Sequence, residues 1–110
     1  MNVPPGRIRT GCDITELAEI ERSLNRFGDR YLRKVFCRDE IDACDGPQRI
    51  PRLAARFAAK EATIKAFASP DSAFALPEIQ VVSTGPVPKL HLTGAAARLA
   101  DDQGWAETSL

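Results

Sequence analysis

The sequence predicts an α+β domain in which helices pack on a mainly antiparallel sheet. Two observations predict this fold class. Stretches of alternating polar and apolar residues occur near the start of the chain and in its last third, and segments with helical spacing fill the region between them. The chain has 110 residues, which fits one small domain. We therefore expect residues 1–110 to form a single domain.

The first part of the chain reads as a strand followed by three helices. Residues 7–13 alternate with period two, as in a half-buried strand. Asp13 then stands where a helix N-cap is expected, and Glu16 follows three residues later, as in a capping box. The first helix should therefore begin at Asp13 and end before Gly28. The two shorter helices that follow are expected at residues 29–35 and 36–44.

The longest predicted helix covers residues 52–67 and follows Pro51, a residue suited to a helix N-terminus. Nearly all of its residues are good helix formers, and it should be on the order of 24 Å long. Leu53, Phe57 and Ile64 lie on or near one side, so we expect them in the core. The alanines between them allow a neighbouring element to approach closely.

The last third of the chain reads as a loop, a hairpin, a helix and a strand. Alternation predicts the strands, and Thr84-Gly85-Pro86 supplies the turn between the first two. Gly104 ends the helix. These elements are expected at residues 69–72, 78–83, 89–92, 95–103 and 105–110.

Composition excludes several classes of protein. Lys plus Arg equals Asp plus Glu at 15 each, so no overall positive field would recruit nucleic acid. The three cysteines form no Cys-x-x-Cys pair, which favours free thiols over a disulfide framework or a zinc site. The N-terminus lacks a signal-like apolar run, and no stretch approaches the ~20 apolar residues of a membrane span. We therefore expect a soluble, cytoplasmic protein without a membrane partner.

Charged residues on the long helix have two possible interpretations. Glu61 and Lys65 are four residues apart and share a face, and from spacing alone a surface ion pair is the simpler explanation. Arg56 and Lys60 lie on a stripe rotated by roughly 140° from Lys65. They form either a solvated face or a basic wall near a bound phosphate.

Asp13 likewise has two possible roles. It is either an N-cap, or a strand-end acid that meets Glu61 around one hard cation. Mg²⁺ commonly takes one or two carboxylates and fills its shell with water and substrate phosphate oxygens. A lysine nearby, such as Lys65, would neutralise the remaining phosphate charge.

Two blocks of the sequence resemble the signature motifs of the phosphopantetheinyl transferase superfamily. The Gly-x-Asp-Ile-x-Glu motif matches residues 11–16, and the Arg-Phe-x-x-Lys-Glu-Ala-x-x-Lys motif matches residues 56–65. Residues 26–28 and 36–40 also resemble the small, single-domain type, the holo-acyl-carrier-protein synthases. The resemblance runs from about Ile8 to the last residue.

The resemblance implies a role for five residues. Asp13 and Glu61 would be the Mg²⁺ carboxylates, and Lys65 would contact the coenzyme A pyrophosphate. Glu61 and Lys65 would thus take part in catalysis. Arg56 would help hold the adenosine part of coenzyme A, and Lys60 would support the phosphate site. Either Glu61 or a metal-ordered water would accept the proton of the substrate hydroxyl.

The resemblance also implies the reaction and the partners. The 4′-phosphopantetheine arm of coenzyme A would move to a serine of an acyl or peptidyl carrier protein, and the protein would be a homotrimer. The family's late Ser-x-Ser-His motif is matched only in its first half, at Ser109-Leu110, so we expect the fold to lack its last strand. A fragment, a strand supplied by a partner and a degenerate relative are all compatible with this. The alternative function is therefore a non-catalytic scaffold that binds coenzyme A or a carrier protein.

Overall fold

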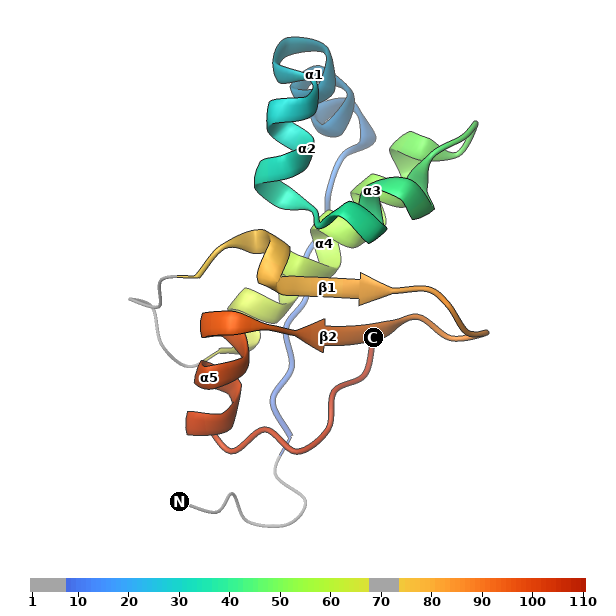
Figure 1. The fold of residues 1–110 in the computed structure, drawn as a ribbon. Helices are drawn as coiled ribbons and strands as arrows, with labels where there is room; N and C mark the ends of the chain where they lie inside the picture. The colour runs from blue at the N-terminus through green and yellow to red at the C-terminus, as the bar shows by residue number, and fades with distance from the viewer. Residues whose placement is uncertain (1–7, 68–73) are drawn as a thin grey trace.

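The computed structural model describes residues 8–67 and 74–110. Five α-helices, a short 3₁₀ helix and a two-stranded antiparallel sheet follow one another along the chain (Figure 1). The predicted loop at 69–72 lies outside the described residues. The elements are α1 (Leu17–Phe27), α2 (Asp29–Val35), α3 (Arg38–Cys44), α4 (Arg49–Ala66), η1 (Leu76–Glu78), β1 (Ile79–Val82), β2 (Lys89–Leu92) and α5 (Gly94–Asp102).

The long helix α4 connects the two ends of the molecule. In Figure 1, α1 and α2 lie at one end, the hairpin and α5 lie at the other, and α4 passes behind β1. It packs against α1, α3 and β1. The strands pair antiparallel, with Ile79 opposite Leu92 and Val82 opposite Lys89. This arrangement confirms the predicted α+β class. No helix in the described ranges combines the length and apolar character needed to cross a membrane.

The main core lies where α1, α2, α3 and the first half of α4 meet. Its largest fully buried apolar side chains include Phe36 and Leu53. Burying a side chain of this size contributes about 1.5–3 kcal/mol. A smaller aromatic group lies at the other end of α4, where Phe67 stacks on Trp105 with ring centroids 4.3 Å apart. Burial at both ends therefore fixes α4 along its length.

The start of the chain differs from its predicted form. The first helix begins at Leu17, and Asp13 is not its cap, because the N-cap is Glu16 and no side chain caps it. The structure assigns no strand to residues 8–13 or to residues 105–110. A strand needs a hydrogen-bonded neighbour, and the sheet within the described residues consists of β1 and β2 alone. The sheet is thus smaller than the alternation predicts.

The boundaries of the other elements shift by at most a few residues. The helix predicted at 52–67 begins at Arg49, three residues early, which places Pro51 in its first turn. A proline is tolerated there because the first N–H groups of a helix have no intrahelical acceptor. The predicted α2 and β2 match their observed bounds.

The cysteines offer a test of this core. Cys44 is fully buried and burial raises the pKa of its thiol, whereas Cys12 is exposed. Because the thiolate is the reactive form, we expect Cys44 to react with a disulfide reagent about a hundredfold more slowly than Cys12 in the native protein. Absorbance of the released thiol measures both rates, and Cys12→Ser identifies the fast one. Equal rates for the two thiols would contradict this core.

Candidate functional site

The N-terminal segment crosses α4 at unusually close range. A Cβ atom on Gly11 would overlap the carbonyl oxygen of Ala62 and lie 2.9 Å from its carbonyl carbon. It would also lie 3.1 Å from the backbone nitrogen of Ala66. Only glycine allows backbone to approach backbone in this way. The contact brings Cys12 and Asp13 over the next turn of α4.

Lys65 holds this segment from α4. Its Nζ donates to Oδ1 of Asp13 at 2.8 Å and to the carbonyl oxygen of Cys12 at 3.1 Å. The hydroxyl of Thr15 donates to the other carboxylate oxygen of Asp13 at 3.2 Å. The Lys65 side chain is 55% exposed and that of Asp13 is 17% exposed. The pair therefore lies at the surface, where solvent reaches the lysine.

Asp13 and Lys65 each stabilise the charged form of the other. The hydrogen bond from Lys65 lowers the pKa of Asp13 below its ordinary value of 3.8. The same bond raises the pKa of Lys65 above 10.5, and the negative charge of Glu61 contributes in the same direction. Near neutral pH the site thus contains an Asp13 carboxylate, a lysine ammonium and Glu61 within electrostatic reach of that ammonium. The structure brings these three predicted residues together.

The oxygen atoms of this cluster suit a hard cation. Asp13 supplies a carboxylate, and the carbonyl oxygen of Cys12 accepts from the same Lys65 ammonium. Glu61 lies within electrostatic reach of that ammonium. Within residues 8–67 and 74–110, no three His, Cys, Asp or Glu side chains gather as a metal site. Mg²⁺ does not require such a cage, because it often uses one or two carboxylates with water and substrate phosphates. The Lys65 ammonium already lies against two of these oxygen atoms, so the cluster accommodates a positive charge.

Arg56 lies on a different side of α4. Its Nη2 donates to the hydroxyl of Ser83 at 2.8 Å, and its Nη1 lies 3.5 Å from the carbonyl oxygen of Arg52. The residue is buried, and its Nε has no acceptor among the residues that the structure describes. Arg56 therefore joins α4 to the end of β1, and a contact with adenosine stays a prediction.

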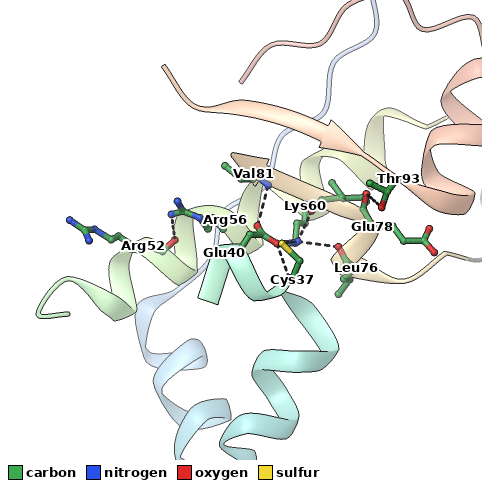
Figure 2. A network of polar contacts seen from close by, with 10 residues as sticks. Cys37, Glu40, Arg52, Arg56, Lys60, Leu76, Glu78, Val81 and Thr93 are labelled. Atoms are coloured by element: carbon green, nitrogen blue, oxygen red, sulfur yellow. Dashed lines mark hydrogen bonds and ion pairs between the residues drawn. The ribbon is translucent and has the colours of Figure 1, made fainter. Parts of the chain in front are cut away.

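Lys60 is fully buried, unlike a phosphate-binding lysine at a surface. Its Nζ donates to Oε1 of Glu40 at 2.7 Å, to the carbonyl oxygen of Leu76 at 3.0 Å and to that of Ile79 (Figure 2). Desolvation lowers the pKa of Lys60, and the bond to Glu40 opposes that shift. An ammonium has three hydrogens, so none remains for a phosphate. The structure thus places Lys60 in a buried structural network, and its support of a phosphate site stays a prediction.

Glu40 is a residue that the sequence alone did not single out. It is 2% exposed, although it sits on a short helix beside charged, exposed neighbours. One sequence signal was present, because Glu40 follows Cys37 at capping-box spacing. The structure contains that box, in which the backbone N–H of Cys37 donates to Glu40. Nothing in the spacing indicates the second role of Glu40 as the partner of Lys60.

We expect Gly11→Ala to lower the free energy of unfolding by about 1–3 kcal/mol, because the atoms that its Cβ meets are backbone and cannot turn aside. Urea denaturation followed by circular dichroism measures this change. Gly85→Ala is the matched control, since a Cβ there meets nothing within 4 Å, and it should stay within about 0.5 kcal/mol of the parent. Equal stability of the two variants would contradict the close crossing.

Comparison with known proteins places this arrangement in a family. The family model for the 4′-phosphopantetheinyl transferase superfamily matches residues 9–105. A holo-[acyl-carrier-protein] synthase of Maridesulfovibrio salexigens is 37% identical over 100 residues, which cover 88% of this chain and 80% of that protein.

Two solved structures share the fold. The holo-[acyl-carrier-protein] synthase of Neisseria meningitidis has a TM-score of 0.80 at 25% identity, over 92% of this chain and 83% of that one. A complex of an ACPS protein with CoA from Chronobacterium ammoniagenes has a TM-score of 0.72 at 29% identity, over 84% and 77% of the two chains. Sequence motifs, fold and relatives agree, and the chain belongs to the 4′-phosphopantetheinyl transferase superfamily as an enzyme of the holo-[acyl-carrier-protein] synthase type.

Proposed function

We propose that this chain transfers 4′-phosphopantetheine from coenzyme A to a serine of a carrier protein in a reaction that depends on Mg²⁺. The observation that carries the proposal is the 2.8 Å contact between Asp13 and Lys65, which joins the two family motifs across 52 positions of sequence. The relatives named as holo-[acyl-carrier-protein] synthases support the reaction class. The related complex with CoA supports the co-substrate.

Asp13 and Glu61 are the residues that would hold Mg²⁺. When bound, the ion would neutralise negative charge on the pyrophosphate of coenzyme A. Lys65 would donate to the same pyrophosphate. Its side chain is long and largely exposed, and partly exposed ion pairs are weak, so it can leave Asp13 for a phosphate at little cost. Binding of coenzyme A would thus exchange one anionic partner of Lys65 for another.

The chemical step is a phosphoryl transfer. The serine oxygen of the carrier protein forms a bond to the phosphorus that bears the pantetheine arm. The bond from that phosphorus to the bridging oxygen breaks, and adenosine 3′,5′-bisphosphate leaves with the electron pair. Glu61 or an ordered water accepts the serine proton. Such a reaction depends mainly on positioning and on charge neutralisation, which are what Lys65 and the two carboxylates supply.

Mass spectrometry tests the proposal directly. An apo acyl carrier protein or peptidyl carrier protein incubated with this chain, coenzyme A and Mg²⁺ should gain the mass of phosphopantetheine. Omitting Mg²⁺ or adding a chelator should abolish the gain. No gain on either class of carrier would overturn the proposal. Binding of coenzyme A without transfer would instead favour the non-catalytic scaffold.

We also propose that the active form is a homotrimer. Exposed apolar side chains flank the site, including Ile8 and Ile14, the latter 91% exposed. A domain of this size buries a limited share of its own surface, so covering these residues by a second copy would add stability. Light scattering after size-exclusion chromatography measures the mass, and a strictly monomeric chain at micromolar concentration would contradict the assembly.

A further inference from the structure

Glu40 and Lys60 contact the edge of β1 that faces away from β2. The backbone N–H of Val81 donates to Oε2 of Glu40 at 3.1 Å, and the carbonyl of Ile79 accepts from Lys60. The carbonyl of Glu78 accepts from Thr93, the residue after β2, so alternation along the strand turns Ile79 and Val81 away from β2. The ion pair therefore makes the donor and acceptor contacts that a neighbouring strand would make (Figure 2).

The same pair ties several elements to α4. Oε1 of Glu40 accepts from both Lys60 and the backbone of Cys37 at the start of α3, and Lys60 also donates to Leu76 in η1. Both side chains are at most 1% exposed. A buried, fully hydrogen-bonded pair has few alternative arrangements, so it fixes geometry more firmly than an exposed pair does. We call these two residues the edge pair.

The edge pair joins α4 to β1 at one face of the helix. Glu61 and Lys65 lie about 100° and 140° around the helix from Lys60. Lys65 contacts Asp13, and Glu61 lies within electrostatic reach of Lys65. A rotation of α4 by about 10° would move a carboxylate that lies about 6 Å from the helix axis by about 1 Å. Metal–ligand distances tolerate only about 0.2 Å. A small rotation of α4 at Lys60 would therefore move the Glu61 carboxylate by more than a metal–ligand distance tolerates.

We propose that Glu40 and Lys60 are positioning residues for the transfer reaction. They set the rotation of α4 against β1 and thereby the separation of Glu61 and Lys65 from Asp13. The effect of this pair on catalysis rests on the proposed function.

The test uses the double variant Glu40→Gln/Lys60→Met, which removes both charges at similar volume and keeps an acceptor for the N–H of Val81. Asp42→Asn is the matched control, because Asp42 belongs to an exposed ion pair with Arg38 on the same helix. Two readouts are needed below the melting temperature. They are the amide NMR shifts of Gly11 and Asp13, and the affinity for Mg²⁺ in the presence of coenzyme A, from calorimetry.

We expect the double variant to be more stable than either single variant, because it leaves no buried charge unpaired. Its amide shifts at Gly11 and Asp13 should nevertheless change, and its Mg²⁺ affinity should fall at least about tenfold. If the double variant is more stable than the single variants but still binds Mg²⁺ weakly, the pair positions the site. A purely structural role would restore both properties together. If the double variant does not fold, Glu40→Asp, which keeps the charge but shortens the side chain, takes its place. The same changes in the amide shifts and in the Mg²⁺ affinity are expected of it.

Either readout at the level of Asp42→Asn would overturn the positioning role and leave the proposed function in place. If the parent chain itself binds no Mg²⁺ with coenzyme A, the proposed function fails instead. The amide shifts alone then decide whether the edge pair positions the Asp13 segment, since that segment lies against α4 without any ligand.

Discussion

Lys60→Met is expected to lower the free energy of unfolding by about 3–5 kcal/mol, because it leaves the buried carboxylate of Glu40 without its counter-charge. The carbonyl oxygens of Leu76 and Ile79 would lose a donor in the same change. Single domains are typically stable by only about 5–15 kcal/mol, so the loss is a large share of the total. Urea denaturation monitored by circular dichroism gives the value from the midpoint and slope.

Lys34→Met is the control for this result. Lys34 lies exposed in the last turn of α2, and its replacement should cost less than about 1 kcal/mol. Similar midpoints for the two methionine variants would mean that Glu40 takes up a proton or finds another partner at no cost. That outcome would contradict the buried ion pair.

The second large effect is on transfer. Asp13→Asn and Glu61→Gln should each reduce kcat/KM for carrier modification by about 10²–10³, because a neutral amide no longer compensates the charge of Mg²⁺. Transfer of the pantetheine arm is measured by mass spectrometry at several Mg²⁺ concentrations. Both variants should keep the parent's circular dichroism spectrum, since both residues are at least partly exposed.

Asp101→Asn provides the comparison, because Asp101 is exposed on α5 and belongs to neither motif. Its kcat/KM should stay within about twofold of the parent. If excess Mg²⁺ fully restores the Glu61→Gln variant, Glu61 binds metal but does not take the serine proton. Unchanged kcat/KM in both site variants at every Mg²⁺ concentration would exclude them as the metal carboxylates.

The helices were largely predictable because their signals are local. Gly28 ends α1 where the sequence places a stop, and α2 and β2 occur at their predicted bounds. The start of α1 was wrong for a non-local reason. Asp13 has the local character of a cap, but a lysine 52 positions away holds its carboxylate instead. The strands predicted at residues 7–13 and 105–110 were wrong for a similar reason. Alternation shows which residues suit a sheet, but it does not show whether a neighbouring strand exists.

The contact between the two motifs at Asp13 and Lys65 was predictable from the sequence, but the surroundings of the other charged residues on α4 were not. Arg56, Lys60 and Lys65 are all basic residues of one helix, and their spacing does not say which of them faces the interior. In the structure Lys60 is fully buried while Lys65 is largely exposed. The difference comes from Glu40, which lies 20 positions earlier and offers the only buried counter-charge that Lys60 meets in the described part of the chain.

The capped edge of β1 also has a consequence for aggregation. Unpaired strand edges invite pairing between molecules, and many proteins protect them with charges or covering loops. Here Glu40 and Lys60 occupy the hydrogen-bonding positions on one side of the hairpin, so an incoming peptide would have to displace a buried ion pair. A strand that adds along β2 would not need to displace this pair. Self-association by sheet growth, and any peptide inhibitor built on that principle, is therefore expected to favour the β2 edge over this edge of β1.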